Sequence, residues 1–430
     1  MVTVEKREPI HYKNLFRGNM GALLGSRILW AFTGSIVNPY LSLYVIALGG
    51  GPEIIGLVNS IGALGGLLLF PVGGYIADKK GRARFVSFAT LGYAISFAFL
   101  AFAQDWSMIA VGLFLQQLFL FYSPALTAIT ADSMPKEMRG MGYALFVSIP
   151  SAIGIISPYI GGYLISAYNV VFANRIGYMI SVALGFVVAA IRMRFLKETL
   201  KASTDQIPLN NIAVLFKNSF KELLNSIRYL ISNLGSYTFI SAIIAFAVSI
   251  SGPFTVVYAK QIIGLTEYQW GTLLLVGGLI QTSISFLIGR YVDAHGCRGT
   301  MVAANIINCT SNIAFIFCKD YVQTGIVYIA FVIGHALIFI SSSAFLANTI
   351  PRSMRGRTSA VLGQGIMTNS LKAGFSSGFL PFTAMFIGSM IGGVIYKLNP
   401  AYPYILFTII SIISAFVCLM KIQNPKKAEE

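Results

Sequence analysis

The sequence predicts an all-α membrane protein whose twelve transmembrane helices form two pseudo-symmetric bundles of six. This fold is predicted by an apolar composition, by apolar stretches of membrane-spanning length, and by loop motifs that occur twice. Hydrophobic residues make up 56% of the 430 residues and charged residues 11%, and the mean hydropathy is +0.74. Soluble proteins carry about 25% charged residues, so this chain could not keep a water-exposed surface wet.

The apolar stretches are long enough to cross a membrane, because about 20 helical residues span the ~30 Å hydrocarbon core. The first six lie near residues 20–48, 54–76, 85–103, 106–130, 141–167 and 171–195. The other six lie near residues 236–262, 268–291, 299–318, 322–347, 357–396 and 401–420.

Two loop motifs each occur twice. Residues 131–140 closely resemble residues 347–356, at an offset of 216 residues. The pattern Gly-x-x-x-Asp-x-x-Gly occurs at 74–81 and at 289–296, at an offset of 215 residues. Because two independent loops agree on the offset, the chain is expected to contain two copies of one unit.

The repeat predicts three regions. An N-terminal six-helix bundle is expected over residues 1–199 and a C-terminal one over residues 236–430. A cytoplasmic linker is expected over residues 200–235, where apolar residues recur at helical spacing from Phe220 to Leu234 and indicate an amphipathic interfacial helix.

The cations predict the orientation. With the N-terminus placed in the cytoplasm, 25 of the 31 Lys and Arg residues flank the spans on that side, three lie outside and three lie within spans. We therefore expect both termini in the cytoplasm. The net charge of +16 is spread over several segments that face anionic lipid, which argues against a nucleic-acid partner. The sequence shows no cleavable signal peptide, and its four cysteines predict neither a disulfide framework nor a metal site.

The loop motifs carry a family resemblance. Residues 74–82, their degenerate copy after the eighth span, the two Pro-x-x-x-Arg-Gly loops and the six-plus-six layout resemble the major facilitator superfamily. In that family such loop charges latch the cytoplasmic ends of the halves in one state. The resemblance implies a conformational gate formed by Asp78, Arg82, Asp132, Arg139, Asp293 and Arg355. The alternative is that these are ordinary interfacial charges.

The resemblance is incomplete in two places. Residues 154–162 resemble the proline-glycine motif that is frequent in exporters of the family, but Ser157 replaces a glycine. Leu113 stands where proton-coupled drug exporters of the family carry an arginine. The first feature favours export, and the second argues against that coupling mechanism.

The spans contain cations but no mid-membrane acid. All 15 acidic residues fall at span ends, in loops or in the tails, whereas Arg27, Arg175, His335 and Lys372 lie within spans. An unpaired cation at a helix centre costs about 3 kcal/mol on insertion scales, so Lys372 is expected to face a water-filled cavity. A cavity lined by cations without acids favours an anionic substrate group.

The candidate substrate-binding residues are polar or charged and lie within spans near this expected cavity: Lys372, Arg27, Asn38, His335, Gln364, Thr368, Gln116 and Gln281. Gln364, Thr368 and Lys372 share one helix face, as do Arg27 and Asn38. Three of these residues have an alternative interpretation. Arg27 would snorkel to headgroups, His335 would be a neutral core residue rather than a proton carrier, and Lys372 would be exposed at a helix break.

The eleventh span contains an insertion. The offset between the repeats grows to 231 residues at Gly392, so about 15 extra residues follow Gly356. Residues 370–381 are rich in glycine and end in Pro381, which predicts a kinked or interrupted helix. Such a break is tolerated only where the backbone lines a cavity or meets protein.

Together these features predict a secondary active transporter that moves a small organic solute, expected to bear an anionic group, across the cytoplasmic membrane. The alternatives are a proton-coupled exporter of amphipathic drug-like compounds and, in another class, a non-transporting membrane sensor. We expect no enzyme activity, because no nucleophile, base and acid occur together, and no cofactor. The expected partners are the solute and the lipid bilayer. The sequence leaves the coupling ion open, with protons as a candidate, and we expect a monomer.

Overall fold

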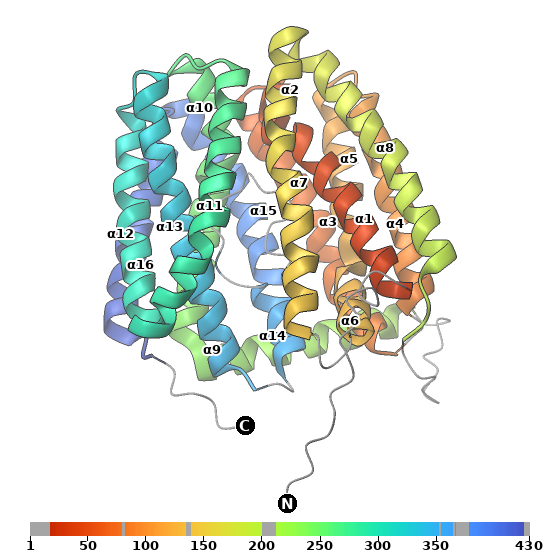
Figure 1. Ribbon diagram of the computed structural model, residues 1–430. Coiled ribbons are helices and arrows are strands. Elements are labelled where there is room, and N and C mark those ends of the chain that lie inside the picture. The colour runs from red at the N-terminus through yellow and green to blue at the C-terminus, as the bar shows by residue number, and fades with distance from the viewer. Residues whose placement is uncertain are drawn as a thin grey trace, which may run out of the picture.

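The computed structural model describes residues 18–79, 82–134, 139–199, 212–351, 354–363, 366 and 378–424. Within these ranges twelve helical segments are long and apolar enough to cross a membrane, which confirms the predicted fold class. Two bundles stand side by side, and α1 (Gly18–Val37) begins at the same end of the molecule at which α16 (Tyr402–Lys421) ends (Figure 1). We call this the terminal end and the other the opposite end.

The N-terminal half consists of α1 with η2 (Asn38–Tyr40) and α2 (Leu41–Ala47), α3 (Pro52–Lys79), α4 (Arg82–Ala101), α5 (Trp106–Phe119) with η3 (Leu120–Tyr122) and α6 (Ser123–Ser133), α7 (Arg139–Ala167) and α8 (Val170–Phe195). The C-terminal half consists of α9 (Ile212–Ser251) with η5 (Gly252–Phe254) and α10 (Thr255–Gln261), α11 (Glu267–His295), α12 (Cys297–Ile316), α13 (Tyr321–Thr349), α14 (Arg355–Leu362), α15 (Phe379–Leu398) and α16.

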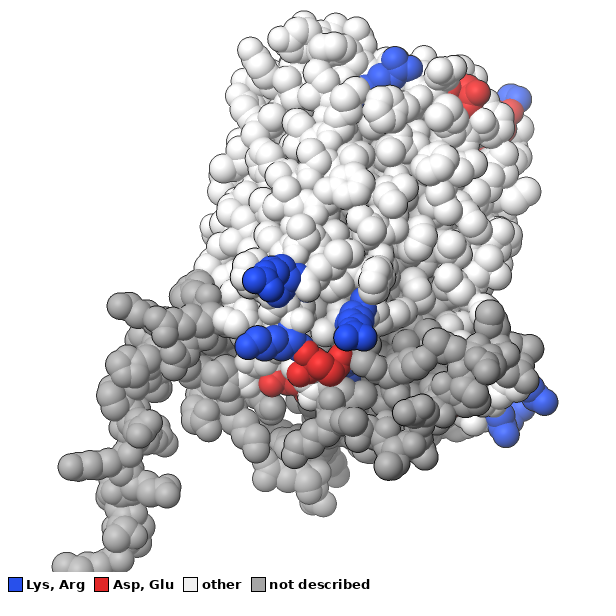
Figure 2. Space-filling view, turned by 90° about the vertical axis from the view of Figure 1, so that its right-hand side faces the viewer, with Lys and Arg blue, Asp and Glu red and all other residues white. Residues whose placement is uncertain are grey.

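Charged side chains are confined to the two ends of the molecule on the face shown in Figure 2. Between them lies a broad uncharged band. Large apolar side chains such as Phe88, which is 65% exposed, and Phe286, which is 72% exposed, lie on the outer surface of the bundles. This surface suits hydrocarbon rather than water, and the chain is therefore a multi-pass membrane protein.

Both halves interrupt their first span at a proline. Pro39 in η2 and Pro253 in η5 each lie in one turn of 3-10 helix that precedes a short helix. Proline has no N–H to donate and clashes with the preceding turn, which accounts for the break. The two prolines are separated by nearly the same offset as the loop motifs, so the duplication extends to local structure.

The linker helix is continuous with the seventh span. Helix α9 begins at Ile212 and is bent at Leu234, whose φ and ψ of −133° and 32° are not helical. The part before the bend lies across the terminal end of the molecule (Figure 1). The amphipathic helix expected from Phe220 to Leu234 is thus the stretch of α9 that leads up to the bend, and the helix extends beyond it in both directions.

The break predicted in the eleventh span at residues 370–381 lies mostly outside the described residues, but the helix ends on either side are described. Helix α14 ends at Leu362, followed by Gly363 with a φ of +76°, and α15 begins only at Phe379. A positive φ is readily adopted by glycine alone, so Gly363 ends the helix. Lys372, Gln364 and Thr368 lie outside the described residues.

The halves meet along two equivalent seams. Helix α3 packs against α15, and α7 packs against α11, so each half contributes its second and fifth spans. Glycines permit the close approach. A β-carbon on Gly56 would lie 2.3 Å from the carbonyl oxygen of Ser389, and one on Gly162 would lie 2.4 Å from that of Glu267. Small residues let helix backbones approach in membranes, where packing drives association.

Polar contacts reinforce these seams toward the opposite end. Ser42 Oγ donates a hydrogen bond to the carbonyl oxygen of Pro253 at 2.5 Å, and the Tyr268 N–H donates to Ser166 Oγ at 3.0 Å. Lys397 Nζ forms an ion pair with Glu53. The opposite end is therefore closed by direct contacts between the halves.

Candidate functional site

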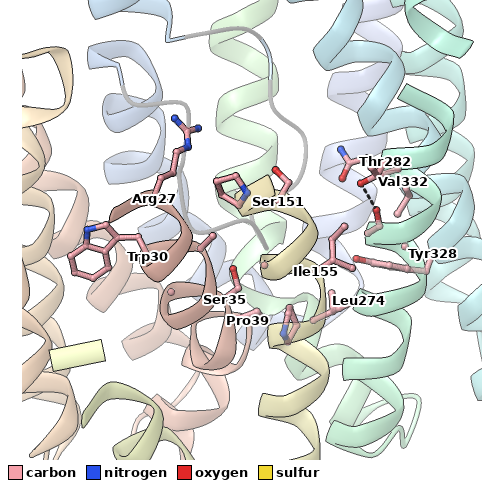
Figure 3. A pocket seen from close by; sticks show the side chains of 18 residues that line it. Arg27, Trp30, Ser35, Pro39, Ser151, Ile155, Leu274, Thr282, Tyr328 and Val332 are labelled. Carbon is pink, nitrogen blue, oxygen red and sulfur yellow. Dashed lines mark hydrogen bonds between the residues drawn. The ribbon is translucent and has the colours of Figure 1, made fainter. Parts of the chain in front are cut away.

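A cavity of about 380 Å³ lies between the two halves (Figure 3). Its walls come from α1, α7, α11 and α13, so both halves contribute. The lining residues are Arg27, Trp30, Ala31, Gly34, Ser35, Pro39, Pro150, Ser151, Gly154, Ile155, Pro158, Leu274, Gly277, Gly278, Gln281, Thr282, Tyr328 and Val332. The lining combines apolar residues and two aromatic rings with five polar or charged side chains: Arg27, Ser35, Ser151, Gln281 and Thr282.

Glycine and proline shape the wall formed by α7. Pro150 and Pro158 lie inside this helix, and each removes one backbone hydrogen bond. The carbonyl oxygen of Pro158 accepts a hydrogen bond from the Tyr40 hydroxyl at 2.7 Å instead of from solvent. Gly154 leaves space beside α1, where a β-carbon would lie 3.2 Å from the carbonyl oxygen of Ala31. The proline-glycine motif therefore positions α7 close to α1 and also exposes part of it to the cavity.

Arg27 is the charged side chain among these lining residues. It is exposed, and its guanidinium carbon lies 4.9 Å from the centre of the Phe146 ring, a cation-π arrangement. The ion pairs described in the structure join other residues. A cation without a neighbouring carboxylate thus faces the cavity, as the sequence predicts for Arg27.

A second cavity, of about 410 Å³, lies within the N-terminal half. Its lining residues are Leu23, Arg27, Trp30, Gly34, Asn38, Tyr93, Phe97, Leu120, Tyr122, Ser123, Leu126, Thr127, Thr130, Phe146 and Arg192. Arg27, Trp30 and Gly34 line both cavities, so the two adjoin at α1.

Sequence reasoning missed Arg192, which it grouped with the cations of the cytoplasmic linker. The structure places Arg192 in the last turn of α8 with only 2% of the residue exposed. Its Nη1 donates a hydrogen bond to Thr90 Oγ1 at 2.6 Å. Gly185, Val188 and Ala189 are buried on the same face, so the helical periodicity of this segment was the signal that could have indicated burial.

Three predicted binding residues lie on the cavities. Arg27 lines both, Gln281 lines the cavity between the halves, and Asn38 lines the second cavity. Asn38 Oδ1 accepts a long hydrogen bond from the Tyr178 hydroxyl at 3.5 Å. Arg27 in α1 and Asn38 in η2 belong to the N-terminal half, and Gln281 in α11 belongs to the C-terminal half.

Two other predicted binding residues are buried between helices. His335 in α13 is 4% exposed and its ring stacks near Phe339, with centroids 6.3 Å apart. Gln116 in α5 is 7% exposed, and its Nε2 has no hydrogen-bond partner. Neither belongs to the lining of the two cavities described above.

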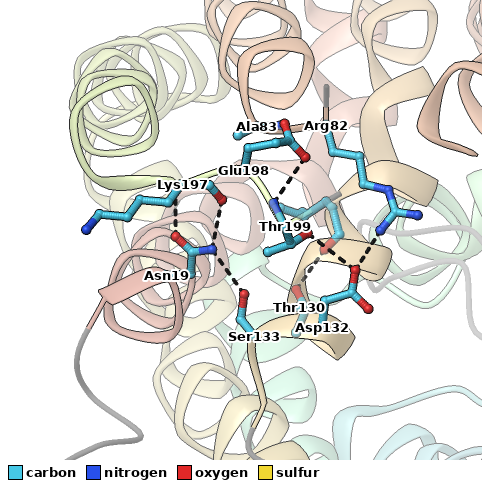
Figure 4. A network of polar contacts seen from close by, with 10 residues as sticks. Asn19, Arg82, Ala83, Thr130, Asp132, Ser133, Lys197, Glu198 and Thr199 are labelled. Atoms are coloured by element: carbon cyan, nitrogen blue, oxygen red, sulfur yellow. Dashed lines mark hydrogen bonds and ion pairs between the residues drawn. The ribbon is translucent and has the colours of Figure 1, made fainter. Parts of the chain in front are cut away.

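Two of the predicted gate residues pair with each other at the terminal end (Figure 4). Arg82 Nη1 lies 2.7 Å from Asp132 Oδ2, which joins the start of α4 to the end of α6. Thr199, at the start of the linker, donates a hydrogen bond to the same carboxylate oxygen at 3.3 Å. Asp293 is exposed in the last turn of α11. Asp78, Arg139 and Arg355 lie in α3, α7 and α14, and their side chains are outside the described part of the structure.

The same network binds the end of the sixth span to the first. Asn19 Nδ2 donates to Ser133 Oγ at 3.1 Å and to the carbonyl oxygen of Lys197 at 2.9 Å, and Asn19 Oδ1 accepts from the Lys197 N–H at 2.7 Å. Glu198 accepts from the Ala83 N–H at 2.9 Å. These contacts lie within one half, so they hold the N-terminal bundle together at this end.

The model of the Major Facilitator Superfamily matches residues 23–368 of this chain. The chain therefore belongs to this superfamily, and the protein is a membrane transporter with the fold and spans described above.

Its relatives include several drug efflux proteins. The multi-drug resistance efflux pump PmrA of Streptococcus pneumoniae is 26% identical over 337 residues, which cover 74% of this chain and 78% of that protein. A PmrA homolog of Lactococcus lactis is 24% identical over 403 residues, covering 90% of this chain and 91% of the relative. The multidrug resistance protein MdtG of Dickeya zeae is 26% identical over 319 residues, covering 71% and 74%.

Solved structures share the fold. The peptide transporter POT in complex with sulfate superimposes with a TM-score of 0.70 at 15% identity, covering 97% of this chain and 95% of that one. The nucleoside transporter NupG gives 0.67 at 14% identity, covering 94% and 99%. The human organic anion transporter MFSD10 gives 0.63 at 15% identity, covering 93% and 98%.

Proposed function

We propose that this protein is a secondary active exporter that carries small amphipathic organic solutes out of the cell by alternating access, with both termini in the cytoplasm. The cavity between the halves carries the proposal. Its volume of about 380 Å³ falls within the range of about 300–1,000 Å³ that is typical of small-molecule sites. Its mixture of apolar walls, two aromatic rings and several polar side chains suits an amphipathic solute.

The position of the cavity supports movement of the halves around it. Its walls come from both halves, and hydrogen bonds from Ser42 to Pro253 and from Tyr268 to Ser166 join the halves toward the opposite end. A solute held there would gain or lose contacts with one half whenever the halves rock, as in transporters built from repeats. If the opposite end opened and the terminal end closed, the same site would then be exposed to the other side of the membrane.

The relatives favour export. Their printed names describe drug efflux or drug resistance, and the aligned segments cover most of both chains. Leu113, where the family's proton-coupled drug exporters carry an arginine, is buried in α5. We therefore propose that proton coupling uses another group, and His335 in α13 is our candidate.

Reconstituted proteoliposomes test the proposal. We expect fluorescent amphipathic dyes to accumulate on one side of the membrane when a pH gradient is imposed, and not without the gradient. Ser151→Trp, which places an indole in the cavity, is expected to abolish accumulation. The matched control is Phe88→Trp, which places the same group on the lipid-facing surface of α4 and should leave accumulation unchanged.

Two results would overturn the proposal. If dyes bind the protein but none crosses the membrane under any gradient, the protein is a sensor rather than a transporter. If Ser151→Trp and Phe88→Trp transport equally well, the cavity between the halves does not carry the solute.

A further inference from the structure

We propose that the second cavity, inside the N-terminal half, binds planar aromatic carboxylates between Arg27 and Arg192. The inference rests on the proposed function only in taking the bound anion to be a transported solute. Binding itself does not depend on transport. The argument starts from the cation that the sequence misplaced.

Arg192 is a buried charge without a buried counter-charge. It is 2% exposed, and the described residues supply one hydrogen-bond acceptor, the neutral Thr90 hydroxyl at 2.6 Å. Among the described residues, its Nε has no hydrogen-bond partner. Its guanidinium carbon lies 5.4 Å from the centre of the Tyr122 ring, which stabilises a cation without neutralising it. Burial of a charged group is costly unless the group is paired, so the site lacks an anion.

Arg27 brings a second cation to the same cavity. It lies over the Phe146 ring, and neither it nor Arg192 takes part in an ion pair within the described part of the chain. None of the fifteen residues that line this cavity is acidic. Two like charges on one cavity repel each other, and an anion between them converts that repulsion into attraction.

The remaining walls favour an aromatic solute over a small inorganic anion. Trp30, Tyr93, Phe97, Tyr122 and Phe146 all line the cavity. Trp30 and Tyr93 meet edge to face, with centroids 5.1 Å apart and planes at 88°. Such rings offer faces and edges to a further ring. The indole N–H of Trp30 is buried without a partner and would donate to an oxygen of the solute.

The size of the cavity sets the length of the ligand. At about 410 Å³ it accommodates a solute of one or two rings. Arginine suits a carboxylate because its planar fork can donate two parallel hydrogen bonds. A two-ring carboxylate such as 2-naphthoate therefore has the chemistry that this cavity lacks, whereas 2-naphthamide has the same shape without the charge.

Calorimetric titration of the full-length protein in detergent tests the inference. We expect 2-naphthoate to bind at least about tenfold more tightly than 2-naphthamide. The reason is that hydrogen bonds to charged groups contribute more binding free energy than hydrogen bonds to neutral groups. Arg27→Gln, at an exposed position, should remove most of this preference. Arg192→Gln should do the same, and Arg192→Lys, which keeps the charge in case the glutamine variant does not fold, should retain part of it.

Arg175 supplies the matched control. It lies in α8 like Arg192, but its Nη2 donates to the carbonyl oxygen of Ala103 at 2.7 Å, and it lines neither cavity. Arg175→Gln should therefore leave the binding of 2-naphthoate unchanged. Equal affinity of the two ligands, or an equal loss in Arg175→Gln and Arg27→Gln, would overturn the inference.

The two proposals fail in different experiments. If 2-naphthoate binds but neither it nor any dye crosses the membrane of proteoliposomes, the proposed export function fails and the binding site stands. If cationic or neutral dyes are transported but the naphthoate and its amide bind with equal affinity, the binding-site proposal fails and the export proposal stands. If inorganic phosphate competes with 2-naphthoate and the aromatic ring of the ligand has no effect on affinity, the assignment to aromatic carboxylates is also contradicted.

Discussion

The two ends of the molecule are held together in different ways. At the opposite end the halves contact each other directly, through backbone packed against glycine and through the bond from Ser42 to Pro253. At the terminal end, the Asn19 network lies within the N-terminal half, and the bond from the Arg298 N–H to Asn424 at 2.9 Å lies within the C-terminal half. Contacts at one end thus set the conformation, whereas those described at the other stabilise each bundle.

The difference has a physical consequence. Contacts between moving halves must break in each cycle, and glycine seams can separate without leaving charges unpaired. Contacts within a half persist through the cycle and can be strongly polar. Substitutions at the opposite end should therefore shift the balance between conformations, and substitutions within a half should change stability alone.

Replacement of Gly162 should have the largest effect. A β-carbon there would lie 2.4 Å from the carbonyl oxygen of Glu267 in the other half, so Gly162→Leu should prevent closure at the opposite end. Overpacking of this kind costs about 1–3 kcal/mol, and we expect transport to fall about tenfold or more. Closure can be followed by adding a thiol reagent from outside to protein that carries Ser151→Cys and lacks the native cysteines. This outside labelling should increase when Gly162→Leu is added. Gly299→Ala, where nothing lies within 4 Å, should behave as wild type.

If Gly162→Leu transports and labels like Gly299→Ala, the glycine seam does not close the opposite end. The comparison between the two ends would then lose its main support.

The ion pair between Glu53 and Lys397 should have an intermediate effect. It joins the halves but is exposed at 37% and 64% of its side chains, and exposed pairs contribute little. Lys397→Glu should raise outside labelling about threefold at low salt, and less at high salt because of screening. The double variant with Glu53→Lys should restore the wild-type value. Lys319→Glu, a charge reversal at another exposed position, is the control.

If outside labelling stays raised in the double variant, net charge rather than this ion pair sets the equilibrium between the conformations.

Loss of Asn19 should reduce stability without changing conformation. Its side chain makes hydrogen bonds to Ser133 and to both backbone groups of Lys197, at 2.7–3.1 Å. Asn19→Ala should lower the free energy of unfolding by about 1 kcal/mol or somewhat more, measured as a lower Tm. Asn233→Ala, which loses one local bond to Tyr229, should lower it less. A change in outside labelling in Asn19→Ala would contradict the division between the ends.

The smallest effect is expected at Asp105, which caps α5 near the opposite end but within one half. The Ser107 hydroxyl and the N–H groups of Ser107 and Met108 donate to its carboxylate, and they lower the pKa of Asp105. A lowered folded-state pKa means that the charged carboxylate adds stability above the ordinary pKa, and that this stability is lost as the pH falls through the folded-state value. The Tm advantage of wild type over Asp105→Asn should therefore shrink as the pH falls below about 4 and vanish below the folded-state pKa.

Outside labelling should stay constant throughout this pH titration. A shift in labelling with the protonation of Asp105 would mean that a contact within one half also controls closure.

Three of the predicted binding residues, Arg27, Asn38 and Gln281, line cavities. Arg27 and Asn38 share a helix face near a break at Pro39, and the structure places both on cavities. His335 and Gln116 were single polar residues within apolar spans, and they are buried between helices instead. Polarity within a span does not specify which neighbouring helix a residue faces. Lys372 lies outside the described residues, so its role stays a prediction.

The role of the loop charges as a gate between the halves stays a prediction. The pairing of Arg82 with Asp132 joins two residues whose charges the loop motifs had singled out. Asn19 and Thr199 were not anticipated, because they are neutral and distant in sequence. Only the return of the sixth span beside the first brings Asn19 and Lys197 together.

The sequence by itself determined the number of spans, the duplication and the family, because a chain in hydrocarbon must satisfy its backbone hydrogen bonds within apolar helices of fixed length. The tertiary structure alone decided which face of each helix meets lipid, seam or cavity. That choice depends on the rotation of each helix against its neighbours. Arg192, charged and near a span end, is buried beside Thr90 and Tyr122 for this reason.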